Sequence, residues 1–128
     1  VGSILGAIGH PGYVTYCTSK FALRGFSEAL ARELADSNIK VKYLAPRTTS
    51  TSINSDAASA MNQALGIHTD RPQWVASQLL ALLQGQGARQ NLGWPEKLFV
   101  AINGLLPNVV DKSMNKNLAL IKRFLVTQ

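Results

Sequence analysis

The stretch "SILGAIGHPGYVTYCTSKFAL", Ser3–Leu23, decides the expected fold. It begins within a short apolar segment, Val1–Leu5, and such a segment followed by glycines is typical of the end of a buried strand. Glycine and proline residues then predict a loop over residues 6–12. From Val14 to Asp36, apolar side chains recur at intervals of three and four residues, which predicts an amphipathic helix. The first part of the chain is therefore expected to run strand, loop, helix.

Four more elements are expected further along the chain. They are a strand over 39–44, a short helix over 56–65, a longer helix over 72–84 and a short strand over 88–93. Pro46 stops the first of these strands, and Thr69 or Asp70 is placed to cap the longer helix, whose first turn contains Pro72. Strands that alternate with helices predict a parallel α/β sheet rather than a helical bundle or a sandwich.

The pattern changes beyond residue 93. From Val110, apolar residues recur on one side of a predicted helix, while lysine, arginine and aspartate occupy its other sides. We therefore divide the chain into an α/β part, 1–93, and an amphipathic helical extension, 94–128. Two interpretations of the extension stay open: it makes peripheral contact with a membrane, or it covers an apolar surface of the domain or of a partner subunit. We favour the second interpretation.

The composition excludes several kinds of function. With Cys17 as the only cysteine, an intramolecular disulfide is impossible, and the separated histidines His10 and His68 make no ligand cluster. We therefore expect no metal site, and a reducing, cytoplasmic location. The net charge of +6 comes from basic residues that do not cluster, so we expect no nucleic-acid partner. No apolar run is long enough to span a bilayer.

Tyr16 and Lys20 are the first candidates for chemistry. They are four residues apart on a predicted helix and therefore share one face. An ammonium group close to a phenol stabilises the phenolate, which brings a weak acid towards the range useful for proton transfer. Ser3, at the end of the preceding segment, offers a hydroxyl that would bond a substrate oxygen. Chemistry on a carbonyl or an alcohol needs these three groups, although the spacing of Tyr16 and Lys20 alone is a weak signal.

The surrounding residues make the signal specific. Ser3-x-x-Gly6, Pro11-Gly12, Tyr16-x-x-Ser19-Lys20 and the sequence "ALRGFSEALARELA" together closely resemble the catalytic segment of the short-chain dehydrogenase/reductase family. The interval of thirteen residues from Ser3 to Tyr16 matches the family's usual spacing, and the resemblance covers roughly Val1–Gly93. It implies the C-terminal portion of a doubly wound, Rossmann-type parallel sheet.

The resemblance also implies roles for individual residues. Ser3 would orient the substrate carbonyl, Tyr16 would act as general acid or base, and Lys20 would assist Tyr16 and bond the nicotinamide ribose. The cofactor would be NAD or NADP, and it would be contacted by the following residues: Tyr16, Lys20, Pro46, Thr49 and Thr51. Arg47 stands where the family usually has glycine. If that position needs a positive φ, arginine would be strained there.

The resemblance sets expectations for the whole protein as well. The glycine-rich dinucleotide fingerprint that precedes the catalytic serine in this family does not occur in these residues. We therefore expect the chain to be the C-terminal half of a longer enzyme acting on an apolar alcohol or carbonyl compound, and to be inactive alone. The alternative is a non-catalytic module that dimerises through the helix Val14–Asp36 or contacts a membrane peripherally through 94–128.

Overall fold

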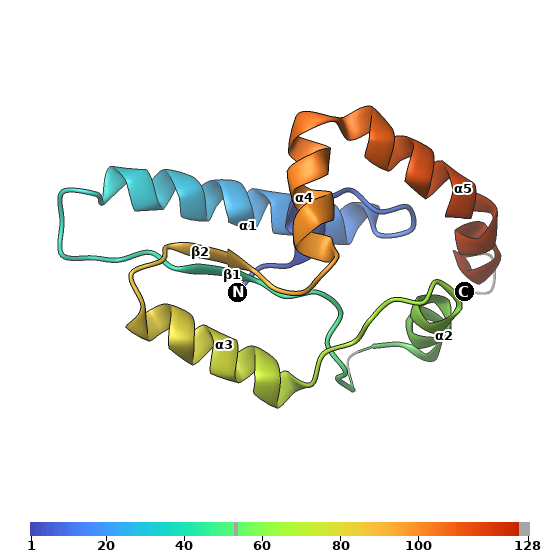
Figure 1. The fold of residues 1–128 in the computed structure, drawn as a ribbon, viewed down its shortest axis with the longest axis horizontal. Helices are drawn as coiled ribbons and strands as arrows, with labels where there is room; N and C mark the ends of the chain where they lie inside the picture. Colours follow the sequence, from blue (N-terminus) through green and yellow to red (C-terminus); the bar gives the residue numbers. More distant parts are fainter. Residues whose placement is uncertain (53, 126–128) are drawn as a thin grey trace.

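The computed structural model describes residues 1–52 and 54–125 (Figure 1). A short 3₁₀ helix, η1, and seven longer or extended elements follow one another along these residues. In chain order they are η1 (Ile4–Gly6), α1 (Val14–Glu33), β1 (Tyr43–Ala45), α2 (Asp56–Ala64), α3 (Pro72–Gln84), β2 (Arg89–Asn91), α4 (Glu96–Leu105) and α5 (Pro107–Leu125).

The two strands form a parallel sheet with helices on both of its faces. β1 pairs with β2 in a register that sets Tyr43 opposite Arg89 and Ala45 opposite Asn91. Figure 1 shows α1 on one side of this sheet and α3 on the other. Parallel strands need a crossover connection, and here α2 and α3 lie in the connection between β1 and β2. The expected α/β architecture, with a parallel sheet between helical layers, is therefore confirmed.

The segment before η1 runs beside β1 without forming a regular strand. The backbone N–H of Gly2 donates to the carbonyl of Leu44 at 2.7 Å, and that of Ile4 donates to Pro46 at 3.0 Å. The prediction of a strand over Val1–Leu5 is wrong, because the chain turns into η1 at Ile4. Ser3 causes this turn in part, since its hydroxyl oxygen accepts a hydrogen bond from the N–H of Leu5 at 3.1 Å.

Helix α1 matches its prediction closely and ends at Glu33 instead of Asp36. Its position over the sheet is fixed by Glu28, which accepts a hydrogen bond from Arg24 at 3.1 Å and forms an ion pair with Arg89 of β2 at 2.7 Å. Cys17 faces inward and is buried, with its sulfur 4.0 Å from the carbonyl oxygen of Ile8. The buried face of α1 therefore packs inward, while the cluster of Arg24, Glu28 and Arg89 links the helix to β2.

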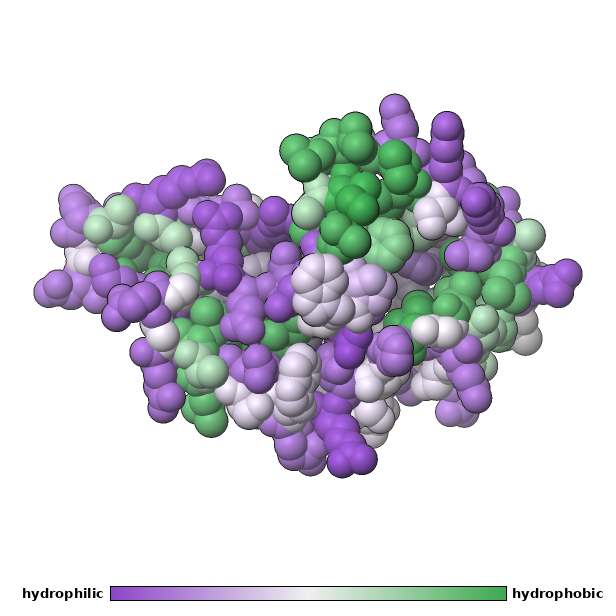
Figure 2. Space-filling view, viewed as in Figure 1, coloured by the Kyte–Doolittle hydropathy of each residue, from purple (hydrophilic) through white to green (hydrophobic). Residues whose placement is uncertain are grey.

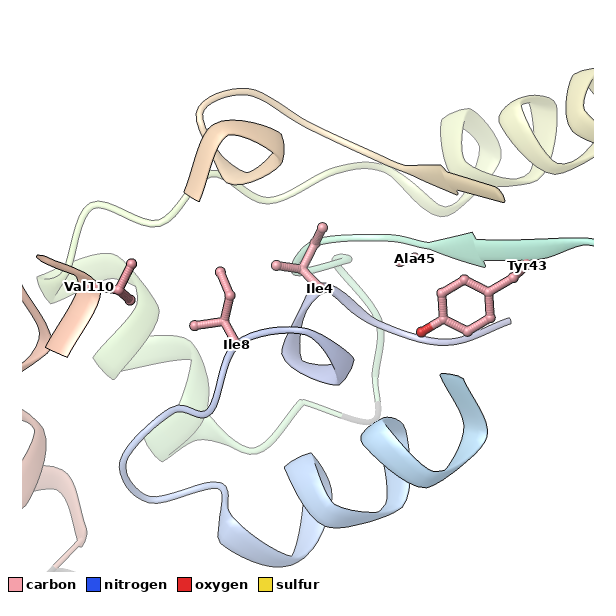
Figure 3. Packing of buried hydrophobic residues seen from close by; sticks show 5 residues of the cluster. All are labelled: Ile4, Ile8, Tyr43, Ala45 and Val110. Atoms are coloured by element: carbon pink, nitrogen blue, oxygen red, sulfur yellow. The ribbon is translucent and has the colours of Figure 1, made fainter. Parts of the chain in front are cut away.

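The core consists of two clusters on opposite faces of the sheet. The first cluster contains Ile4, Ile8, Tyr43, Ala45 and Val110 (Figure 3). The second cluster contains Leu44, Leu82 and Leu92, with Val75 and Leu79 packed against it. Tyr43 and Ala45 thus face the first cluster and Leu44 the second, which is the alternation expected along a strand.

Two further local predictions are wrong. β1 begins only at Tyr43, because Ile39 is 61% exposed and the chain before Tyr43 has no neighbouring strand to pair with among the described residues. Neither Thr69 nor Asp70 caps α3: its cap residue is Arg71, which makes no side-chain cap bond. The carboxylate of Asp70 is instead bound by Arg47.

The helical extension packs against the α/β part. Asn103 of α4 donates to the carbonyl of Ala7 at 2.9 Å, and α5 packs against α2. Val110 and Ile121 of α5 are buried, so the apolar side of this amphipathic helix faces the rest of the chain. This packing supports the interpretation of the extension as a cover, while the boundary at residue 93 and peripheral membrane contact stay predictions. Residues 126–128 of the predicted extension lie outside the described residues.

The outer surface of α4 is apolar. Green, hydrophobic side chains gather over α4 in Figure 2, and its exposed apolar residues include Leu98, Phe99 and Leu105. Within the described part of the chain, no helix combines the length and hydropathy needed to cross a bilayer.

Candidate active site

Tyr16 and Lys20 lie one helical turn apart near the start of α1. The Nζ atom of Lys20 is 5.4 Å from the centroid of the Tyr16 ring, which is within the range of a cation–π contact. Tyr16 is 43% exposed, so its hydroxyl is accessible to a substrate. Among the described residues, Lys20 has no ion pair with a carboxylate. Its N–H groups are therefore available to a ligand.

Ser3 is the cap residue of η1, the element that packs against this part of α1. η1 packs on α1, and a Cβ at Gly6 would lie only 2.7 Å from the carbonyl oxygen of Lys20. Glycine at this position therefore permits the close approach of the two elements. Ser3 is buried, and its hydroxyl oxygen accepts from Leu5, which leaves the hydroxyl hydrogen able to donate. Of the three predicted catalytic residues, Tyr16 and Lys20 thus lie on α1, and Ser3 immediately precedes the element that packs against it.

Tyr13, the cap residue of α1, lies beside Tyr16 and also beside His10 of the preceding loop. The ring of Tyr13 lies 6.2 Å from that of Tyr16 and 5.6 Å from that of His10, both in edge-on geometry. Burial raises the pKa of Tyr13, and the charge of Tyr16 raises it further. Sequence reasoning missed Tyr13 as a neighbour of Tyr16. The signal was the interval of three between the two tyrosines, since residues three apart meet on a helix.

A buried tyrosine supports the segment that carries Ser3. Tyr43 lies beneath Gly2 and Gly6, and a Cβ at Gly2 would overlap the Tyr43 hydroxyl. Among the described residues, this hydroxyl has no hydrogen-bond partner. Burial raises the pKa of Tyr43, and the backbone of Ser3, which faces the hydroxyl without reaching hydrogen-bond geometry, offsets part of the rise. The close packing of Gly2 and Gly6 on Tyr43 therefore determines how near the Ser3 segment lies to β1.

The predicted cofactor residues follow β1 directly. The carbonyl of Pro46 accepts the hydrogen bond from Ile4, so the loop after β1 begins beside the Ser3 segment. Thr49 donates its hydroxyl to the carbonyl of Arg47 at 3.2 Å, whereas Thr51 is exposed. Thr51 borders an open depression of about 350 Å³ whose other polar lining includes Thr48, Ser50, Asn54, Asn62 and Thr69. Hydroxyl and amide groups of this kind suit a polar ligand.

Arg47 is not strained. No non-glycine residue in the described part of the chain has a positive φ, so the expectation of strain at this position is wrong. Its guanidinium binds both carboxylate oxygens of Asp70, at 2.8 and 2.9 Å, and one carboxylate oxygen of Glu96 at 3.2 Å. The bond to Asp70 is the main cause that raises the pKa of Arg47. Sequence reasoning found neither acidic partner, because both are more than twenty residues away along the chain.

Metal chemistry receives no support from the arrangement of side chains. Within residues 1–52 and 54–125, no group of three or more histidine, cysteine, aspartate and glutamate side chains is placed to hold an ion. The hydroxyl groups of Ser3 and Tyr16 and the ammonium of Lys20 are groups that can take part in hydrogen bonding and proton transfer.

Comparison with known proteins agrees with this geometry. Residues 1–62 match the family model described as short chain dehydrogenase, and this region contains η1, α1 and β1. The two-stranded parallel sheet with its helices is consistent with a Rossmann-like α/β fold. The match assigns residues 1–62 to the short-chain dehydrogenase family.

Three curated relatives show how far the similarity extends. The chain is 52% identical over 46 residues to nodulation protein G of Rhizobium meliloti strain 1021, covering 36% of this chain and 19% of the relative. It is 37% identical over 86 residues to carbonyl reductase family member 4 of Xenopus laevis, covering 66% and 36%. It is 37% identical over 65 residues to 3-oxoacyl-(acyl-carrier-protein) reductase FabG of Pseudomonas aeruginosa, covering 51% and 26%. The matched segments thus span between about a fifth and a third of these relatives.

Proposed function

We propose that the whole protein is an NAD(P)-dependent oxidoreductase that interconverts an alcohol and a carbonyl group, with Tyr16 as general acid or base. The observation that carries this proposal is the contact of Lys20 with the Tyr16 ring, on a helix that packs against the Ser3 segment. Two of the relatives described above are reductases by name, and one is named for the carbonyl group.

The residues divide the chemistry between them. The Ser3 hydroxyl donates a hydrogen bond to the substrate oxygen, and Tyr16 Oη delivers a proton to that oxygen in reduction or removes it in oxidation. The Lys20 ammonium stabilises the negative charge that forms on the phenol oxygen when the proton leaves. A bound nicotinamide supplies or accepts the hydride. The unpaired ammonium of Lys20 and the exposed hydroxyl of Thr51 are donors that suit its ribose and carboxamide.

An apolar substrate is the second part of the proposal. The Pseudomonas relative is named for a 3-oxoacyl group, which places a carbonyl on an acyl chain. Within this chain, α2 buries Met61 and packs against the amphipathic helix α5. Leu125 at the end of α5 also contacts Gly12, in the loop that leads to Tyr16. An apolar side chain of α5 thus lies against the loop that precedes Tyr16, and apolar surroundings of this kind favour an apolar ligand.

Turnover by the full-length protein tests the proposal. NADH or NADPH oxidation is followed with a panel of ketones that includes 3-oxoacyl thioesters, and the reverse reaction with the corresponding alcohols. We expect turnover with one dinucleotide and an apolar carbonyl compound. The 128-residue chain alone is expected to give none, because it lacks the glycine-rich dinucleotide fingerprint. Absence of dinucleotide binding and turnover in the full-length protein would defeat the proposal.

A second candidate function is dimerisation through α1. Phe26 is 64% exposed on this helix, Phe21 is exposed as well, and small residues lie beside them at Ala22, Gly25 and Ala29. An exposed stripe of small and aromatic residues suits close helix–helix packing between two copies. Light scattering of the wild type and of Phe26→Glu tests this candidate, with Phe99→Glu on α4 as the matched exposed control. A wild type that stays monomeric at all concentrations would exclude it.

A further inference from the structure

The first residues of the loop after β1 are joined by backbone hydrogen bonds to the segment before α3. The backbone N–H of Ser50 donates to the carbonyl of Asp70, and that of Asp70 donates to Thr48, each at 2.9 Å. Thr49 and Asp70 thereby form an isolated parallel bridge. The loop is thus joined, before it reaches Thr51, to the segment that precedes α3.

The side chain of Arg47 reinforces this junction and adds a third segment. Its Nε and Nη2 atoms bind Asp70 in the two-pronged geometry that is specific to arginine. Its Nη1 atom donates to the carbonyl of Trp94 at 3.0 Å and to Glu96 at the first residue of α4 at 3.2 Å. The exposed fractions of the three side chains are 16% for Arg47, 10% for Asp70 and 19% for Glu96, so water competes weakly for these bonds.

Gly93 provides the space that Arg47 occupies. It has a φ of +91°, and a Cβ at this position would lie 2.7 Å from Cδ of Arg47 and 2.9 Å from the Glu96 carboxylate. The absence of a side chain at Gly93 therefore allows the Arg47 side chain to pack against the turn after β2. The network thus depends on the guanidinium of Arg47, on the carboxylates of Asp70 and Glu96, and on the absence of a side chain at Gly93.

We propose that Arg47 is a positioning residue for cofactor binding. By tying the loop after β1 to Asp70 and to the start of α4, it holds Thr49 and Thr51 where they contact the nicotinamide cofactor. This inference rests on the proposed function, because the loop has a cofactor only if the protein is a nicotinamide-dependent oxidoreductase. It adds that the helical extension takes part in placing that loop, through Glu96 and Trp94.

Steady-state kinetics of the full-length protein give the first test. Arg47→Ala is expected to raise the KM for the dinucleotide about tenfold, the size typical of losing a buried charged hydrogen-bonding group, with kcat changed less than about twofold. Arg47→Lys is expected to behave like Arg47→Ala, since a single ammonium does not reproduce the fork. Glu96→Gln, which affects only the contact with α4, is expected to raise the same KM by a smaller factor. Arg89→Ala is the control, because Arg89 pairs with Glu28 away from this loop.

A structural role alone would lower the amount of folded enzyme and leave the dinucleotide KM unchanged in the remainder. An unchanged KM in both Arg47 variants would therefore overturn the inference while leaving the proposed function in place.

Amide hydrogen exchange gives a second test that does not require turnover. Faster exchange at Ser50 and Asp70 in Arg47→Lys, with the amide of Tyr43 in β1 unchanged, is the expected result. Exchange at these two amides equal to that of the wild type would refute the positioning role, even in a protein that binds no dinucleotide.

Discussion

The Nζ atom of Lys20 lies 5.4 Å from the centre of the Tyr16 ring, on the helix that packs against the 3₁₀ turn begun by Ser3. This relationship joins the three residues that the sequence singled out for proton chemistry. It arises from local rules, because residues four apart on a helix share a face and Gly6 permits the close approach of the preceding segment.

Gly93→Ala is expected to destabilise the chain. The substitution imposes a Cβ on a residue with a φ of +91° and places it against Arg47 and Glu96. The backbone term alone is about 1 to 2 kcal/mol, so we expect a loss of about 2 kcal/mol or more in the free energy of unfolding. Urea denaturation measures it. Gly104→Ala in α4 is the matched control: a Cβ there meets nothing within 4 Å, and a gain of up to about 1 kcal/mol is expected. Equal effects of the two substitutions would contradict the packing around Arg47.

Tyr43→Phe is expected to be neutral or to stabilise the chain by up to about 1 kcal/mol, because it removes a buried hydroxyl that has no partner among the described residues. It also changes the response to alkali. The pKa of Tyr43 is raised above its ordinary value of 10.0, so the wild type keeps its full stability below pH 10 and loses part of it as the pH rises through the raised pKa.

Thermal melts at increasing pH compare the wild type with Tyr43→Phe and Tyr13→Phe. We expect the alkaline loss to be smaller in Tyr43→Phe than in the wild type. Each single variant should retain the part of the alkaline stability loss that comes from the other tyrosine, because the pKa of that tyrosine is also raised. A Tyr43→Phe variant with the same alkaline loss as the wild type would contradict the burial of this hydroxyl.

Glu28→Gln is expected to weaken the attachment of α1 to β2 and to remove one acid-dependent contribution to stability. The hydrogen bond from Arg24 and the charge of Arg89 hold the pKa of Glu28 below its ordinary value of 4.5. Its contribution is therefore present above pH 4.5 and is lost as the pH falls through the lowered pKa. We expect a difference of less than about 1 kcal/mol at neutral pH, since surface ion pairs contribute little. Melting curves that stay separated by the same amount at low pH would contradict this assignment.

The sequence predicted local structure well and long-range contacts poorly. The helix containing Tyr16 and Lys20 was predicted almost to its ends, because its periodicity is a local property. The Val1–Leu5 segment was expected to be a strand, yet the hydroxyl of Ser3 caps a turn that ends its extended part early. The strand predicted over 39–44 is observed only as Tyr43–Ala45. Alternating apolar and polar residues form a strand only where a neighbouring strand pairs with them, and within the described part of the chain β2 pairs only with these residues.

Arg47 shows the main limit of sequence reasoning at the candidate site. As a substitution for the usual glycine, it suggested backbone strain, but the structure shows a junction of three segments. Asp70 and Glu96 lie 23 and 49 residues away along the chain, so nothing local to Arg47 indicated them. The amphipathic pattern of α5 was likewise visible in the sequence, whereas the surface that it covers was visible only in the fold.

The most direct test of the account is the activity of Tyr16→Phe in the full-length protein, assayed by NAD(P)H oxidation with an apolar carbonyl substrate. Loss of a positioned general acid lowers the rate by about 10² to 10⁴, so we predict a fall in kcat of that size with an unchanged melting temperature. Tyr13→Phe, which alters the neighbouring ring at the cap residue of the same helix, should keep most of the activity. A Tyr16→Phe protein that turns over substrate as fast as the wild type would contradict the role of Tyr16 as general acid or base.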